Sequence, residues 1–344
     1  MVLDLENQLN MQKRKVDFNS YDISVKEIIS MIVEGIIDIA PEYQRHFRWE
    51  EPRQSTLIES VFLGIPIPNI FMATNTDGTW ELIDGVQRIC SIVNFVGDPE
   101  AMKKVNLKKP LKLEELKKLT YFNDKYFKDL PRTIQLGFLL APLKVTTLSD
   151  KSDLGVRFDL FERLNTGGVK LTNQEIRSCI YRGPFNDFLK KLAKNKDFHN
   201  VVHLSPAQEN DGTREELVLR FFAYLYNYKN FDHSVVDFLN DYMKSANQVF
   251  AYDKNERIFN YVFKSLKAAL PNGISKSRKT TPLNLYEAVS VGAALTYIKK
   301  KKINTAGIEE LIKSQELHQY TTGSTNQKSK VIARIEYCQR NFEE

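Results

Sequence analysis

Residues 79–96 read TWELIDGVQRICSIVNFV and predict a strand, a tight turn and a helix in direct succession. Trp80 to Ile83 form a short apolar run with one charged interruption, which is typical of a buried strand. Asp84 and Gly85 end that run with a dipeptide that favours turns. From Arg88 onward, apolar residues recur at helical spacing, at positions 89, 92, 93 and 96.

The turn has the composition of an anion site. The first amides of the expected helix lack intrahelical partners and carry partial positive charge. Gly85 lets a ligand approach the backbone, and Arg88 adds a planar cation suited to phosphate. Asp84 can hold a metal, a ribose hydroxyl or a water, or it can fix Arg88. A purely structural turn closed by an Asp84–Arg88 pair is the alternative that these residues leave open.

Composition and charge restrict the class of protein. The chain has 344 residues, of which 42% are hydrophobic and 27% charged, as in soluble globular proteins with one large or two smaller domains. A net charge of +6 permits nucleotide or nucleic-acid binding without requiring it. The widely spaced Cys90, Cys179 and Cys338 fit reduced thiols in a cytoplasmic protein. We expect neither a secretory signal nor a membrane span.

The chain up to residue 182 alternates strand and helix patterns. Ser24 to Glu27 matches a capping box, which predicts a helix that ends near Gly35. Another amphipathic helix is expected at 55–62, and the pattern LKLEELKKL at 111–119 also predicts a helix. Strands are expected at 17–23, 36–39, 70–73 and 143–148.

Two further segments in this part carry candidate ligand-binding side chains. Gln44 and Arg45 lie in an aromatic and arginine-rich loop, where cations beside aromatic rings can grip phosphate and stack on a base. Trp49, in the same loop, is expected to pack instead. Arg163 and Asn165 stand where a helix meets a glycine-rich turn, an arrangement in which amides and side chains can converge on a ligand.

Helix capping explains a third polar cluster. Thr172 and Glu175 form the pattern of a capping box, so a structural explanation suffices for Glu175. Arg177 lies close to Glu175, and an ordinary ion pair between the two is its simplest interpretation.

From Phe185 onward the pattern is helical throughout. Aromatic stripes at 215–228 and 235–250 are expected in the core. His199 and His203 stand four residues apart but lack a nearby third ligand, so zinc binding is not expected. Basic side chains that could contact phosphate, or form only a solvated loop and helix end, are Lys276, Arg278, Lys279, Lys328, Lys330 and Arg334.

Four blocks together resemble a known family. They are PEYQRHFRW at 41–49, GIPIPNIFM at 64–72, IDGVQR at 83–88 and FDLFERLNTGGVKLTNQEIR at 158–177. Their order and spacing are similar to the N-terminal domain family of the GmrSD-type restriction endonucleases, which belongs to the ParB/sulfiredoxin-like superfamily. The family motif Asp-Gly-Gln-Gln-Arg is matched here except that Val86 replaces its first Gln.

The resemblance implies a fold and an activity. The fold is α+β, with a ParB/sulfiredoxin-like mixed α/β domain over residues 18–182, which carries the Asp-Gly-Val-Gln-Arg turn, and a helical domain over residues 183–344. The activity is nucleotide binding and hydrolysis in a prokaryotic or phage defence protein of the restriction type. Many members carry a separate His-Asn-His nuclease domain, fused or in a partner, and this chain has no such motif.

We therefore expect an NTP-binding and NTP-hydrolysing protein that associates with DNA. Asp84, Gln87 and Arg88 would be catalytic, with Asp84 positioning Mg²⁺. The expected nucleotide-binding residues are Gln44, Arg45, Gly85, Arg88, Arg163, Asn165 and Gly168.

Two alternatives remain open at this point. One is a metal-dependent nuclease of the same fold that uses Asp84 and Glu175. The other is a non-enzymatic DNA-binding adaptor that uses the basic segments 276–279 and 299–302. DNA is the expected partner, a separate nuclease subunit is a further candidate, and the oligomeric state, a homo-oligomer included, is open.

Overall fold

The chain forms two compact units, Met1–Leu171 and Thr172–Glu344. The computed structural model describes residues 2–13, 17–39, 47, 49–75, 77–149, 154–164, 171–232, 234–275 and 280–344. The boundary expected from the sequence lies after residue 182, but helix α9 (Asn173–Ile180) contacts α12 (Thr213–Asn227) and so belongs to the second unit.

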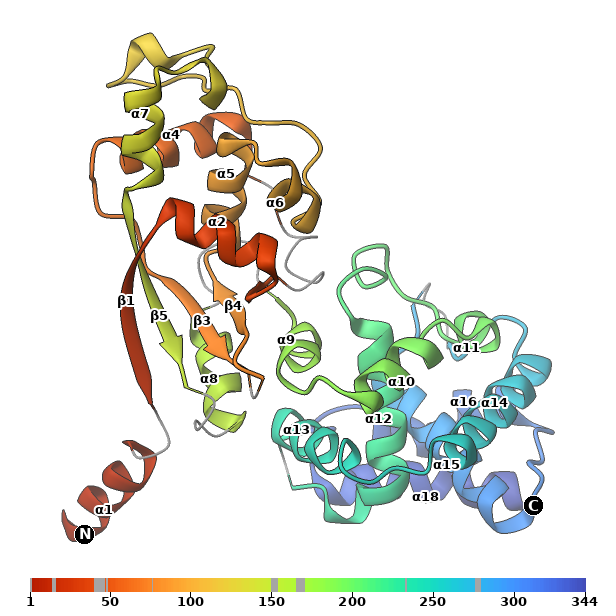
Figure 1. The fold of residues 1–344 in the computed structure, drawn as a ribbon. Coiled ribbons are helices and arrows are strands. Elements are labelled where there is room, and N and C mark those ends of the chain that lie inside the picture. The colour runs from red at the N-terminus through yellow and green to blue at the C-terminus, as the bar shows by residue number, and fades with distance from the viewer. Residues whose placement is uncertain are drawn as a thin grey trace. The chain divides into compact units, whose positions relative to one another are not determined.

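The first unit is built on one mixed sheet of five strands in the order β1-β5-β3-β4-β2 (Figure 1). Strand β5 pairs antiparallel with β1 and parallel with β3, and β4 pairs antiparallel with β3 and parallel with β2. This sheet, followed by a helical region, confirms the α+β fold class. The strands span Phe18–Ser24 (β1), Ile37–Asp38 (β2), Ile70–Thr74 (β3), Trp80–Asp84 (β4) and Pro142–Leu148 (β5).

Helices complete the core of the first unit. Ser24 Oγ accepts a hydrogen bond from Glu27 N at 3.2 Å, and Gly35 ends α2 with φ 77°. The rings of Phe62, Phe95 and Phe138 pack on one another beneath α4 and α5. The helices span Val2–Lys13 (α1), Val25–Glu34 (α2), Glu51–Phe62 (α4), Val86–Val96 (α5), Pro99–Lys104 (α6), Arg132–Leu139 (α7) and Leu154–Leu164 (α8).

The prediction of a helix at 111–119 is wrong, because the backbone amides of this segment donate hydrogen bonds to side chains elsewhere in the unit. Glu59 Oε1 accepts hydrogen bonds from the amides of Lys118 and Leu119, each at 2.8 Å. Ser55 Oγ accepts from the Glu114 amide at 3.1 Å, and Glu115 has a positive φ of 55°. These bonds and this backbone conformation are incompatible with a continuous helix.

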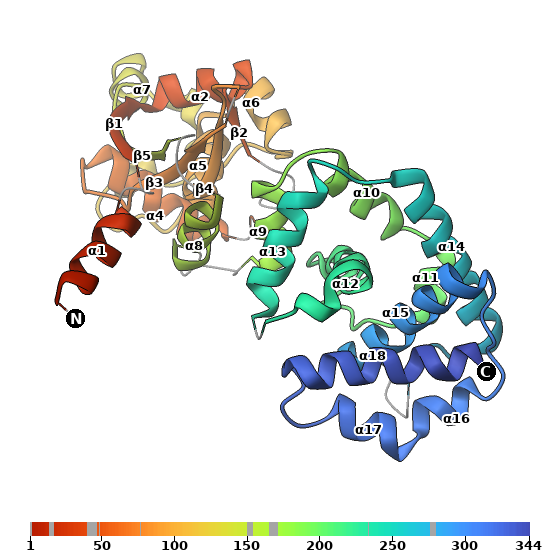
Figure 2. The ribbon, with the colours of Figure 1, turned by 90° about the horizontal axis from the view of Figure 1, so that it is seen from below.

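Helix α12 is the centre of the second unit, and Figure 2 shows it surrounded by its neighbours. Phe221 and Phe222 on α12 are fully buried, which confirms that the aromatic stripe is core. Among the described residues this unit contains helices and turns only. Its other long helices span Pro184–Leu192 (α10), Val235–Ala246 (α13), Tyr252–Ala269 (α14), Leu283–Lys300 (α15) and Lys328–Glu343 (α18).

Close packing of α15 on α18 depends on a glycine. A Cβ atom at Gly292 would lie 2.7 Å from the Cβ atom of Cys338. The three cysteines are buried thiols, as expected, and burial raises the pKa of the Cys90 thiol to about 12. No helix in the described part of the chain is both long and apolar enough to span a membrane.

Candidate functional site

The strand, turn and helix predicted at residues 79–96 are present. Strand β4 ends at Asp84, Gly85 adopts φ 110° and ψ 12°, and α5 begins at Val86, two residues before the expected start. The N-cap residue of α5 is the buried Gly85, which has no side chain with which to cap the helix. The amides at a helix N-terminus lack intrahelical partners and favour an anion.

Asp84 and Arg88 form the ion pair that the sequence had left as an alternative. Arg88 Nη2 contacts Asp84 Oδ2 and also donates a hydrogen bond to the carbonyl of Asn69 at 3.0 Å. The Arg88 side chain is 13% exposed and that of Asp84 is 29% exposed. Arg88 Nε is buried and has no hydrogen-bond partner among the described residues.

The guanidinium group of Arg88 folds back over the turn. A Cβ atom added to Gly85 would lie 3.2 Å from Arg88 Nη2 and 3.3 Å from Ile70 Cγ1. Glycine is needed here both for its positive φ and for this close approach.

Gln87 fixes the segment that leads into α4. Its Oε1 accepts a hydrogen bond from the Trp49 amide at 3.2 Å. Gln54 Nε2 donates to the Trp49 carbonyl at 2.7 Å, and Asn94 Nδ2 donates to Gln54 Oε1 at 3.1 Å. The guanidinium carbon Cζ of Arg53 lies 4.4 Å from the centroid of the Trp49 ring, in a cation–π contact. These residues form a polar clamp between α4 and α5 that sequence reasoning missed.

A sequence signal for this clamp did exist. Gln54 is buried and shares the inner face of α4 with Ile58 and Val61, at spacings of four and seven residues. Asn94 follows Gln87 by seven residues on α5. Buried polar side chains are normally hydrogen-bonded, so amides on two inner helix faces indicate mutual contact.

Of the other predicted nucleotide-binding residues, the structure describes Arg163 alone. Arg163 is exposed in the last turn of α8, and no hydrogen bond or ion pair between described residues links it to Asp84 or Arg88. Several predicted site residues lie outside the described residues, namely Gln44, Arg45, Asn165, Gly168, Lys276, Arg278 and Lys279.

Asp84 is the carboxylate of the turn that could be a ligand for a divalent metal. In the described part of the chain, no group of three or more His, Cys, Asp or Glu side chains is placed to hold a metal ion. Mg²⁺ that arrives with a nucleotide usually takes only one or two protein carboxylates besides phosphate oxygens and water. The partly exposed Asp84 fits that mode of binding.

Glu175 has the structural role predicted for it. Thr172 Oγ1 accepts from the Glu175 amide at 3.2 Å, and Glu175 Oε2 accepts from the Thr172 amide at 2.9 Å. Arg177, in contrast, was expected to pair with Glu175, but its main contacts are with other residues. Its Nη1 contacts Glu216 Oε2 at 3.0 Å, and its Nε donates to Asn240 Oδ1 at 2.8 Å.

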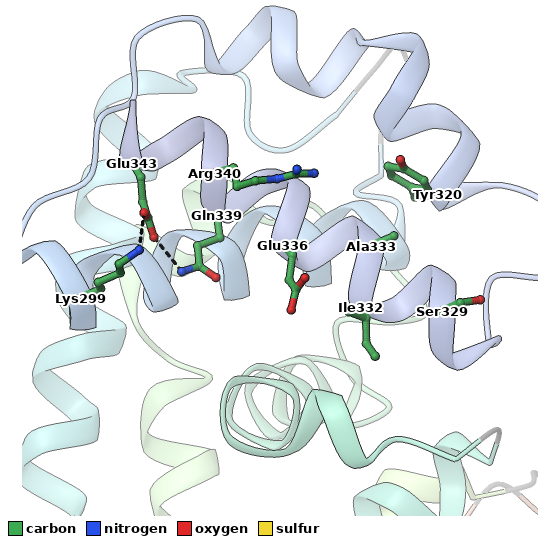
Figure 3. Close-up of a pocket in the computed structure, with 9 residues that line it drawn as sticks. All are labelled: Lys299, Tyr320, Ser329, Ile332, Ala333, Glu336, Gln339, Arg340 and Glu343. Atoms are coloured by element: carbon green, nitrogen blue, oxygen red, sulfur yellow. Dashed lines mark hydrogen bonds and ion pairs between the residues drawn. The ribbon is translucent and has the colours of Figure 1, made fainter.

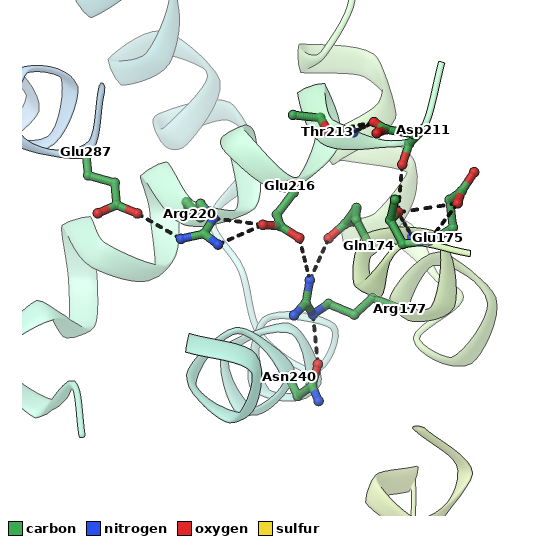
Figure 4. A network of polar contacts seen from close by, with 10 residues as sticks. Gln174, Glu175, Arg177, Asp211, Thr213, Glu216, Arg220, Asn240 and Glu287 are labelled. Carbon is green, nitrogen blue, oxygen red and sulfur yellow. Dashed lines mark hydrogen bonds and ion pairs between the residues drawn. The ribbon is translucent and has the colours of Figure 1, made fainter. Parts of the chain in front are cut away.

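Arg177 begins a buried network of alternating charges in the second unit (Figure 4). Glu216 also contacts Arg220 at 2.8 Å, Arg220 contacts Glu287 at 2.9 Å, and Glu287 contacts Arg334. Burial lowers the pKa of Arg177 below its ordinary value, although the Glu216 carboxylate acts in the opposite direction. Burial opposes the charged form of Arg220 too, but the carboxylates of Glu216 and Glu287 keep its pKa above the ordinary value.

The prediction that Arg334 binds DNA is therefore wrong. Its side chain is only 1% exposed, is paired with Glu287 and donates to the Thr325 carbonyl at 2.6 Å. Lys328 is exposed at the start of α18, whereas Lys330 Nζ donates to the Thr322 carbonyl at 2.7 Å.

The histidine pair is not on one helix. Helix α11 spans Lys196–Val201, so His203 lies beyond its end. His199 Nε2 instead lies 2.7 Å from the Ala193 carbonyl oxygen.

A cavity of about 570 Å³ lies along α18 in the second unit (Figure 3). Its walls carry both signs of charge, with Lys299 and Arg340 beside Glu336 and Glu343. Lys299 Nζ is bound to Glu343 Oε2 at 2.6 Å. This balance gives the cavity no clear preference for an anion such as DNA phosphate.

The fold and the turn define an α+β protein whose sheet presents an acidic glycine turn and an uncapped helix N-terminus. Residues 25–182 match the family model of the GmrSD restriction endonuclease N-terminal domain, so this part of the chain is a domain of that family. The matched family is of the restriction or defence class and is associated with DNA. No curated protein and no solved structure matches the chain.

Proposed function

We propose that this protein binds and hydrolyses a nucleoside triphosphate at the β4–α5 turn and does so in association with DNA. One observation carries the proposal: a partly exposed carboxylate at the end of β4 directly precedes a buried glycine and an uncapped helix N-terminus. Backbone amides in that position favour phosphate, and the neighbouring carboxylate suits a metal that accompanies phosphate.

The residues of the turn receive distinct roles. The first amides of α5 bind phosphate oxygens, and Asp84 holds Mg²⁺. Bound Mg²⁺ would neutralise charge on the transferred phosphoryl group. Arg88 fixes the Asp84 carboxylate, and its Nη1, which has no partner among the described residues, remains for phosphate.

Gln87 is assigned first to positioning. Its Oε1 is bound to the Trp49 amide, so it attaches the segment that follows Gln44 and Arg45 to the start of α5. Orientation of the attacking water by Gln87 and phosphate binding by Arg45 stay predictions. For DNA we retain Lys276, Arg278, Lys279, Lys328 and Lys330.

Phosphate release from each of the four NTPs, with and without DNA, tests the proposal. We expect Asp84→Asn to lower the rate about 100-fold, because charge stabilisation at the phosphoryl group is lost. Asp124→Asn is the matched control, since it also removes one carboxylate from an ion pair, that with Lys112, away from the turn. Equal rates in wild type and Asp84→Asn would contradict the proposal.

A further inference from the structure

A second cavity, of about 350 Å³, opens in the first unit where β3 and β5 begin. Its walls combine apolar and polar surface, and the apolar side chains include Phe62, Ile65 and Leu143. Polar side chains on the walls are Asp22, Asn69 and Lys144. Apolar side chains with a few polar groups, at a volume near the lower end of the roughly 300–1,000 Å³ range, are typical of small-molecule sites.

The cavity adjoins the proposed phosphate site. Asn69 lines the cavity, and its carbonyl accepts the hydrogen bond from Arg88 Nη2 at 3.0 Å. Strands β3 and β5 are parallel and β4 is antiparallel to β3, with Phe71 opposite Asp84. The starts of β3 and β5 and the end of β4 therefore lie at the same edge of the sheet.

A helix glycine lies at the wall of the cavity and gives a position from which to fill it. Gly137 lines it from within α7, and a Cβ atom added there would meet no atom within 4 Å. Gly137 is not among the glycines with positive φ, so the helix does not need glycine at this point. A methyl group at this position meets open space, so a side chain larger than that of alanine is needed to fill the cavity from here.

The polar wall can pair with a heterocyclic ring. Among the described residues, the one contact of Asn69 Nδ2 is a long one, of 3.4 Å, to Thr146 Oγ1. Its amide therefore retains an acceptor and a second donor for a ligand. Asp22 and Lys144 are register partners on β1 and β5 and add one acceptor and one donor at the wall.

We propose that this cavity holds the base of the nucleotide whose phosphates bind at the β4–α5 turn, an inference that rests on the proposed function. A nucleotide joins an uncharged flat ring to an anionic chain. The structure places a cavity with apolar side chains and a few hydrogen-bonding groups beside a turn that suits an anion. The exposed side chains of Leu63, Leu136 and Leu140 belong to the same region of α4 and α7, and a docked protein side chain is the rival occupant.

Titration calorimetry with the four NTPs and with inorganic triphosphate, on the full chain, tests the proposal. We expect Gly137→Leu to weaken binding of the preferred NTP at least tenfold while triphosphate binds as to wild type. Gly137→Ala is the matched control and should bind the NTP within about twofold, because its methyl group meets open space. Thermal melting of both variants verifies that they fold. Asn69→Ala should reduce discrimination among the four bases, since the ring would lose its amide partner.

The outcomes separate this inference from the proposed function. If Gly137→Leu folds and binds the NTP as wild type does, the base lies elsewhere and the cavity is left to a docked side chain. If wild type binds triphosphate and all four NTPs with equal affinity, no ring site contributes, and only the inference fails. If wild type binds neither triphosphate nor any NTP, both fail.

Discussion

Gly85 is the residue on which the geometry of the turn depends most directly. Its φ of 110° lies in a region that L residues rarely adopt, and a Cβ atom added to it would lie close to Arg88 Nη2 and Ile70 Cγ1. The same small residue gives α5 an open N-terminus and lets the Arg88 side chain fold back to Asp84. Backbone freedom and ion-pair geometry are thus coupled at one position.

Replacement of Gly85 by Ala should lower the free energy of unfolding more than the same change at Gly78. Gly78 also has a positive φ, of 85°, but a Cβ atom there meets open space. The control is expected to lose roughly 1–2 kcal/mol from the backbone alone. Gly85→Ala should lose about 1 kcal/mol more, because Ile70 or Arg88 must move. Urea unfolding measures both, and equal losses would show that the contact does not matter.

At the scale of elements, the caps show how local chemistry determines where a helix begins and ends. The caps at Ser24 and Thr172 were both predicted from four-residue patterns and both form. The failed helix at 111–119 had good periodicity, but its amides bind side chains of α4 instead. Periodicity therefore predicts a helix only where no other partner takes the backbone donors.

Glu175→Gln should leave both stability and phosphate release unchanged, because glutamine also completes a capping box with Thr172. Glu175→Ala should lower the free energy of unfolding by about 1 kcal/mol, the usual cost of a lost cap. Urea unfolding and phosphate release check these outcomes. Metal-dependent nicking of plasmid DNA that is lost in Glu175→Gln would instead favour the nuclease alternative.

At the scale of the whole molecule, buried charge connects helices that are distant in sequence. Arg177, Glu216, Glu287 and Arg334 come from α9, α12, α15 and α18, with Arg220 between the two carboxylates. Through this network α9 is joined to the helices of the second unit, and the boundary between the units lies after Leu171, eleven residues before the position 182 that the sequence suggested. Removing one member would leave a buried charge uncompensated.

The stability that Glu216 contributes should depend on pH. Burial would raise its pKa, but the guanidinium groups of Arg220 and Arg177 hold it below the ordinary value. A carboxyl with a lowered folded pKa stabilises the protein above its unfolded pKa of about 4.3, and this contribution is lost as pH falls through the folded pKa. We expect Glu216→Gln to cost about 2 kcal/mol at pH 7 and progressively less below about pH 4.

Denaturant unfolding from pH 7 to pH 3 measures this dependence. Glu215→Gln is the control on the same turn of α12, because Glu215 has no ion pair among the described residues. It should change stability little at any pH. A cost for Glu216→Gln that stays constant down to pH 3 would contradict the coupling.

Neighbouring residues were sufficient to predict most strands and helices, the β4–α5 turn and both caps, because periodicity, turn propensity and capping act over a few positions of the chain. Tertiary structure alone decided the partners of the charged groups. Arg177 meets Glu216 across 39 residues, and Arg334 meets Glu287 across 47. It also decided that Gln87 binds Trp49 and that a cavity lies beside Asn69. These contacts join segments that only the packed sheet and helices bring together, so no local pattern records them.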